Sequence, residues 1–91
     1  MKQKKIYIVE DARIIALELQ RVLENLGYVV SGIAGSGEEA IEAVVAADPD
    51  LILMDVRLSG RMSGIEASRE IRKRINIPVI YTTAYSDKTI V

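Results

Sequence analysis

The stretch LILMDVRLSG, residues 51–60, places an aspartate directly after four apolar residues. An uninterrupted apolar run of this length is typical of a strand that is buried on both faces, as in a parallel sheet. Asp55 ends the run, and the polar, glycine-containing segment that follows it has the composition of a loop. Residues 51–56 are therefore predicted to form a buried strand that carries a carboxylate at its end.

Similar apolar segments occur elsewhere in the chain, with helical patterns between them. Further strands are predicted at residues 6–9, 28–34 and 77–83. Three amphipathic helices are predicted to begin at Ala12, Ser36 and Ser63, and the two serines each open an S-x-x-E capping box. Strands that alternate with helices predict right-handed crossovers, and thus an α/β fold with helices on both faces of an open parallel sheet.

Composition limits the chemistry available to the chain. Its 91 residues, 49% of them hydrophobic, are expected to form one domain over residues 1–91. The absence of cysteine and histidine excludes disulfides, thiolate zinc sites and the usual general base. A net charge of -1 argues against direct nucleic-acid binding. The short apolar run near the N-terminus is insufficient for a signal peptide or a membrane span, so residence in the cytoplasm is expected.

Polar side chains end three of the predicted strands. Glu10 and Asp11 follow the first, Asp55 ends the third, and Thr82 and Thr83 end the fourth. Because ligands bind outside the carboxyl ends of parallel strands, these groups are expected at one rim of the sheet. Two carboxylates about 4 Å apart repel by roughly 4 kcal/mol at an effective dielectric constant of about 20, so a cation is expected between them. Oxygen ligands at an open rim favour Mg²⁺.

The rim residues have candidate roles and simpler interpretations. Asp55 is the candidate nucleophile toward phosphorus, Glu10 and Asp11 the metal-holding pair, and Thr83 a hydrogen-bond donor to a phosphoryl oxygen. Taken singly, Asp55 could end a strand, Asp11 could cap a helix, and Thr83 could be a β-former. Their joint placement at the ends of parallel strands favours a functional site.

Three motifs resemble the receiver domain of two-component response regulators. They are YIVED at residues 7–11, DLILMDVRLSGRMSGIEA at 50–67 and IPVIYTTAY at 77–85. The resemblance implies a flavodoxin-like sheet with strand order 2-1-3-4. It also implies that Asp55 accepts a phosphoryl group from a phosphohistidine of a partner sensor histidine kinase, so that the chain is a signalling module and not an enzyme.

The same resemblance implies roles for the residues around Asp55. Mg²⁺ would be bound directly by Asp11 and Asp55, through water by Glu10, and by the backbone carbonyl of Arg57. Thr83 would be the switch hydroxyl that moves toward the phosphoryl group. Gly64 would permit the loop to turn before the third helix.

The chain departs from the family pattern at two places. Ser59 stands where many members have proline, a difference interpreted as affecting loop geometry more than chemistry. The chain also ends eight residues after Thr83, so the fifth strand and last helix of a complete receiver are expected to be missing. The fourth strand would then be an edge, and self-association through that edge or through the uncovered sheet face is expected.

Alternative functions follow from the same residues. One is a truncated or engineered receiver fragment that folds, associates and binds metal but lacks signalling output. An aspartate-nucleophile phosphatase requires a second aspartate two residues after the nucleophile, where Arg57 stands. Nucleotide binding has weak support, because GIAGSGEE at residues 32–39 lacks both the G-x-G-x-x-G and the P-loop lysine patterns.

Overall fold

A computed structural model describes residues 3–82 of the chain. Strands and helices alternate through this range, as predicted from the sequence. In chain order the elements are β1 (Lys5–Val9), α1 (Arg13–Asn25), β2 (Val29–Ala34), α2 (Gly37–Ala47), β3 (Leu51–Asp55), α3 (Gly64–Arg72) and β4 (Val79–Thr82). Thr83, the predicted switch hydroxyl, lies outside the described residues.

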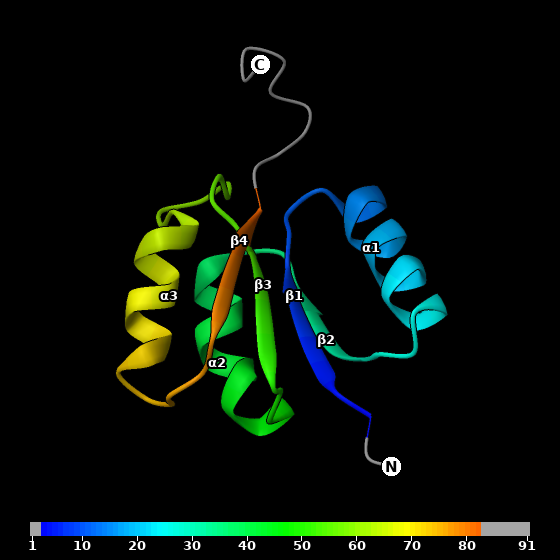
Figure 1. Ribbon diagram of the computed structural model, residues 1–91. Coiled ribbons are helices and arrows are strands. Elements are labelled where there is room, and N and C mark those ends of the chain that lie inside the picture. Colours follow the sequence, from blue (N-terminus) through cyan, green and yellow to red (C-terminus); the bar gives the residue numbers. More distant parts are fainter. Residues whose placement is uncertain (1–2, 83–91) are drawn as a thin grey trace.

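The described strands form one parallel sheet in the order β2-β1-β3-β4 (Figure 1). The predicted α/β fold and its strand order are confirmed. Val9 at the end of β1 pairs with Ala34 of β2 and Met54 of β3, and Asp55 pairs with Thr82. Because the strands end in register, the residues that follow them lie at the same rim.

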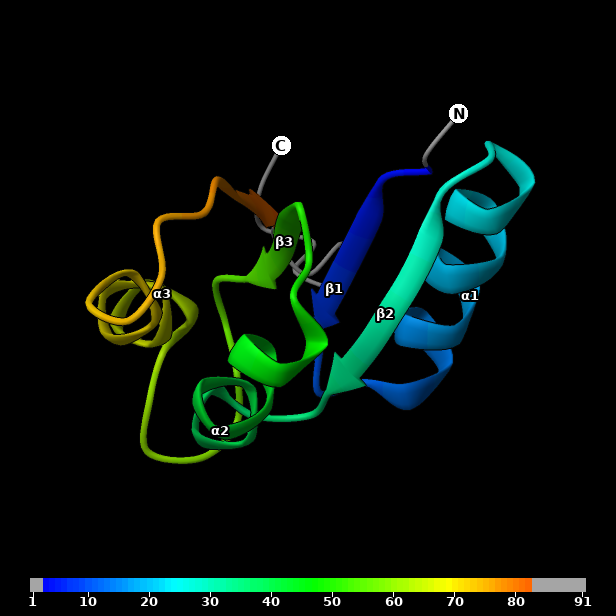
Figure 2. The same cartoon turned by 90° about the horizontal axis from the view of Figure 1, so that it is seen from below.

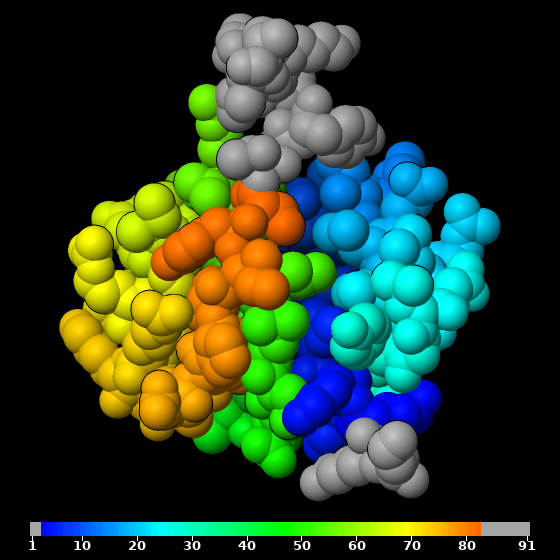
Figure 3. Space-filling view, in the orientation of Figure 1, coloured from blue at the N-terminus to red at the C-terminus, as the bar shows by residue number. Residues whose placement is uncertain are grey.

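Helices cover both faces of the sheet, with α1 on one face and α2 and α3 on the other (Figure 2). The main hydrophobic core lies between the sheet and the α2 and α3 layer. Its largest fully buried members include Ile52, Met54, Val44 and Ile71. On the α1 face, side chains of β3 are visible between β4 and α1 (Figure 3).

The helix starts follow the predicted capping residues in two of three cases. Ser36 caps α2 by accepting a hydrogen bond from the Glu39 amide at 3.1 Å. Ser63 and Glu66 form a complete capping box at the start of α3. At α1 the N-cap is Ala12, which makes no side-chain cap, so the carboxylate of the preceding Asp11 is available for another role.

The fourth strand is shorter than predicted. It begins at Val79 and not at residue 77. Pro78 immediately precedes the strand and has no N–H to donate to a sheet ladder, although its carbonyl accepts a hydrogen bond from the Ile52 amide at 3.1 Å. The Ile77 side chain is instead buried in the core, which explains why its apolar character resembles that of a strand residue.

Candidate functional site

The rim of the sheet brings together the three predicted carboxylates. One oxygen from each of Glu10, Asp11 and Asp55 lies within 4.8 Å of the others. This arrangement follows from the pairing of β1 with β3, because Glu10 and Asp11 come directly after β1 and Asp55 is the last residue of β3. Asp55 thereby joins Glu10 and Asp11, which are 44 or more positions away in the sequence, in one acidic cluster.

Loop groups orient one oxygen of each carboxylate in the cluster. The Ala12 amide donates to Oε2 of Glu10 at 3.0 Å, and the Arg57 amide donates to Oδ1 of Asp55 at 3.1 Å. Asp11 is held by Ser59, whose amide and hydroxyl both donate to Oδ2, at 3.1 and 2.6 Å. The second oxygen of each carboxylate remains for a ligand.

The carboxylates differ in burial and therefore in acidity. Glu10 and Asp55 are 5% and 1% exposed, whereas Asp11 is exposed. Burial raises the pKa of Glu10 to about 7, and repulsion from the Asp55 charge adds to this shift. Burial also raises the pKa of Asp55 above its ordinary value. The hydroxyl of Ser59 lowers the pKa of Asp11. Two of the three groups thus resist ionisation unless positive charge is nearby.

One buried oxygen of Asp55 lacks a hydrogen-bond partner among residues 3–82, which makes the site suitable for a cation. This oxygen is Oδ2. A buried charged oxygen without a partner is costly, and a bound cation would remove that cost. Three carboxylates with no nitrogen or sulfur ligand suit a hard divalent ion, so the residues fit the Mg²⁺ predicted from the sequence.

Gly64 allows the loop after β3 to pass close to Asp55. A Cβ at this position would lie 2.0 Å from the backbone oxygen of Asp55, a distance that no side chain tolerates. The Gly64 amide also donates to the carbonyl of Val56 at 2.9 Å. Gly64 was expected to permit the turn before the third helix. The close approach of its backbone to that of Asp55 explains why a glycine is needed there.

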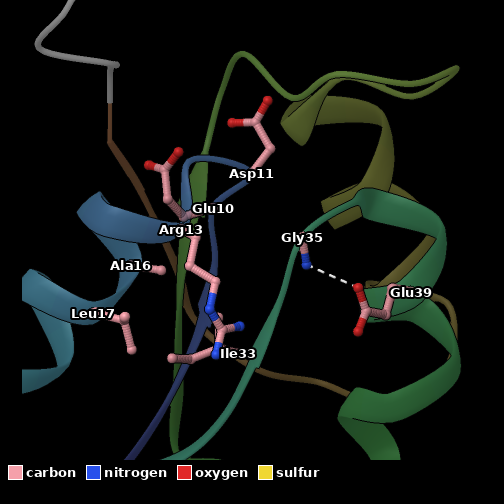
Figure 4. Close-up of a pocket in the computed structure, with 8 residues that line it drawn as sticks. All are labelled: Glu10, Asp11, Arg13, Ala16, Leu17, Ile33, Gly35 and Glu39. Atoms are coloured by element: carbon pink, nitrogen blue, oxygen red, sulfur yellow. Dashed lines mark hydrogen bonds between the residues drawn. The ribbon is translucent and has the colours of Figure 1, made fainter.

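A hollow of about 180 Å³ lies beside the acidic pair (Figure 4). It is lined by Glu10, Asp11, Arg13, Ala16, Leu17, Ile33, Gly35 and Glu39. The guanidinium of Arg13 lies beside Ile33 and away from the carboxylates of Glu10 and Asp11 (Figure 4). Arg13 therefore does not neutralise Glu10 and Asp11, whereas the charge of Arg57 acts on Asp55 in the direction that lowers its pKa.

The structure also bears on the remaining predicted residues. Thr82, not Thr83, is the last described residue of β4, and it pairs with Asp55. The amide of Arg57 contacts Asp55, while the role of its carbonyl stays a prediction. Ser59 contacts the site directly, a role that the sequence interpretation missed. Ser59 and Asp11 are 48 positions apart, so no local pattern indicates their contact.

Comparison with known proteins establishes the family. The sequence model of the response regulator receiver domain matches residues 6–91. The transcriptional regulatory protein PdtaR of Mycobacterium tuberculosis is 36% identical over 88 residues, which are 97% of this chain and 42% of that protein. The chain belongs to the response regulator receiver domain family. It spans about two fifths of the length of this relative.

Solved structures agree with this assignment. The signal receiver domain of a modulated diguanylate cyclase from Desulfovibrio desulfuricans G20 superimposes with a TM-score of 0.85 at 37% identity, over 92% of this chain and 67% of that one. The anti-anti-sigma factor PhyR from Bartonella quintana, in its complex with the anti-sigma factor NepR, gives a TM-score of 0.84 at 35% identity. That match covers 98% of this chain and 37% of PhyR.

Proposed function

We propose that the chain is a phosphoacceptor module in which Asp55 takes a phosphoryl group from a phosphohistidine of a sensor kinase. The observation that carries this proposal is the carboxylate of Asp55, which is buried at the rim with one oxygen oriented by the Arg57 amide and the other unpaired among the described residues. The acidic pair from β1 lies beside it. Membership of the receiver family supports the same role.

The chemistry requires one bond to form and one to break. An oxygen of Asp55 attacks phosphorus, the P–N bond to the donor imidazole breaks, and the imidazole keeps the electron pair and takes up a proton. Mg²⁺ bound at the cluster would neutralise charge on the phosphoryl oxygens. Glu10 and Asp11 would hold that positive charge at the rim, and the Arg57 amide orients the attacking carboxylate.

Further roles come from the family resemblance and are part of the proposal. Asp11 and Asp55 would bind the cation directly, Glu10 would bind it through water, and the carbonyl of Arg57 would complete the set. Thr83 donates to the phosphoryl group after transfer. The chain acts as the acceptor of a group and not as an enzyme. Residence in the cytoplasm is proposed from the sequence. Within residues 3–82 no helix combines the length and apolarity needed to span a membrane.

Partners are proposed from chemistry and from exposed surface. The kinase donor is implied by the acceptor aspartate. A second copy of the chain is implied by β4, which is at one edge of the described sheet and exposes 51% of Ile80 and 41% of Tyr81. Side chains of the neighbouring strand are also visible beside it (Figure 3). Edge strands of this kind pair readily with other chains.

Incubation with Mg²⁺ and a small phosphodonor such as acetyl phosphate tests the central proposal. Intact mass spectrometry should detect the addition of one alkali-labile phosphoryl group to the wild type and none to Asp55→Asn. Asp50→Asn is the matched control, because Asp50 immediately precedes β3, at the opposite end of the strand from Asp55, and accepts a hydrogen bond from the Lys5 amide. It should be modified like the wild type.

Two results would contradict the proposal. An adduct that persists in Asp55→Asn would place the acceptor elsewhere. Mg²⁺ binding by the wild type without any adduct would favour the alternative function, a receiver fragment that binds metal and associates but has no signalling output.

A further inference from the structure

We propose that Ser59 is a specificity-determining residue of the acidic site, which favours Mg²⁺ over Ca²⁺ by restricting Asp11 to one available oxygen. The inference deepens the proposed function, since it takes the acidic cluster to be a cation site. It concerns the choice of cation and not the transfer of a phosphoryl group. The two can therefore be tested separately.

Ser59 occupies one oxygen of Asp11 completely. Its amide and its hydroxyl both donate to Oδ2, at 3.1 and 2.6 Å. A carboxylate oxygen has two lone-pair positions, so two donors saturate it. Oδ1 is then the oxygen of Asp11 that remains for a cation, and Asp11 becomes a monodentate ligand.

The other two carboxylates each have one oxygen that accepts a single hydrogen bond from a backbone group, so that oxygen keeps one lone pair. The Ala12 amide holds Oε2 of Glu10, and the Arg57 amide holds Oδ1 of Asp55. These donors belong to the main chain and are unchanged by substitution of side chains. The hydroxyl of Ser59 is therefore the side-chain group through which the denticity of the cluster can be varied.

Denticity distinguishes the two cations. Ca²⁺ takes about 6–8 oxygen ligands and often binds carboxylates through both oxygens. Mg²⁺ requires octahedral geometry, keeps several waters and uses one or two carboxylates through single oxygens. Asp11, restricted to one oxygen by Ser59, supplies what Mg²⁺ needs and less than Ca²⁺ needs. Release of Oδ2 of Asp11 should therefore benefit Ca²⁺ selectively.

A purely structural role for Ser59 makes a different prediction. Ser59 is exposed and lies in the loop between β3 and α3, so its bonds to Asp11 also anchor that loop against the end of β1. If anchoring were its whole role, removal of the hydroxyl would weaken the binding of both cations by the same factor. The ratio of the two dissociation constants separates the interpretations.

Isothermal titration of the 91-residue chain with MgCl₂ and with CaCl₂ measures that ratio. In Ser59→Ala one lone pair of Oδ2 is freed, and the ratio Kd(Ca²⁺)/Kd(Mg²⁺) should fall by about 3- to 10-fold, the effect expected for one hydrogen bond of ordinary net strength. Ser59→Thr keeps the hydroxyl and should keep the wild-type ratio. Ser31→Ala is the matched control, because it removes a β2 hydroxyl that has no hydrogen-bond partner among the described residues.

Each outcome decides between the interpretations. An unchanged ratio in Ser59→Ala, or an equal change in both constants, overturns the inference while leaving the proposed function intact. A ratio that responds as expected in a chain that takes up no phosphoryl group supports the inference and contradicts the proposed function. A wild-type chain that binds neither cation overturns both.

Discussion

Replacement of Glu10 by glutamine is expected to stabilise the metal-free protein above neutral pH. Burial raises the pKa of Glu10 from its ordinary value of 4.5 to about 7. Each pH unit between these values corresponds to about 1.4 kcal/mol, so the ionised side chain costs the folded state about 3 kcal/mol. Glutamine is isosteric, cannot ionise, and can still accept the hydrogen bond from the Ala12 amide. It should therefore avoid this cost.

The direction of the pH dependence follows from proton binding. Between about pH 4.5 and 7 the folded protein holds a proton on Glu10 that the unfolded chain has lost, so stability falls as the pH rises through this range. The raised pKa of Asp55 acts in the same direction. The lowered pKa of Asp11 affects stability only below its ordinary value of 3.8.

Urea unfolding followed by circular dichroism in EDTA measures this effect. Wild type and Glu10→Gln should have similar free energies of unfolding near about pH 4.5, and the variant should be more stable by about 3 kcal/mol near about pH 8.5. Parallel pH profiles for the two proteins would refute the reasoning, because they would mean that Glu10 is not the group that loses stability. Excess Mg²⁺ should reduce the difference, since a bound cation stabilises the charged form.

Two further predictions concern the loop after β3 and the sheet edge. Gly64→Ala should destabilise the protein by about 2 kcal/mol or more in urea unfolding, because its Cβ would overlap the backbone of Asp55. Gly35→Ala, whose Cβ would lie 3.7 Å from Glu39, is the control, and equal losses would contradict this explanation. Ile80→Lys should weaken self-association by about tenfold in light scattering. A wild-type chain that stays monomeric at high concentration would exclude association through this edge.

Local patterns in the sequence were sufficient to predict the elements of the fold. A strand shows itself as a short run of apolar residues, and a helix as apolar residues at helical spacing. Both patterns reflect which side chains are buried, and each lies within a single segment of the sequence. The capping boxes at Ser36 and Ser63 are likewise local, because the interacting groups are three residues apart. The start of β4 was predicted too early, because an apolar residue such as Ile77 is suited both to a strand and to a core position.

The carboxylate cluster was predictable for a related reason. Parallel strands end at the same rim, so residues that follow adjacent strands come together whatever the intervening helices contain. Glu10, Asp11 and Asp55 satisfy this rule within 4.8 Å. Their different acidities were not predictable, because burial of Glu10 and Asp55 and exposure of Asp11 depend on how the loops pack over the rim.

The sequence by itself determined the alternation of strands and helices, the rim at which the acidic residues meet, and the family to which the chain is similar. The tertiary structure alone decided which oxygen of each carboxylate is held by a loop group and which remains for a ligand. Hydrogen bonds such as those from Ser59 to Asp11 join residues 48 positions apart. Their geometry depends on the path of a loop that passes close to the end of β3 at Gly64, and no local propensity encodes that path.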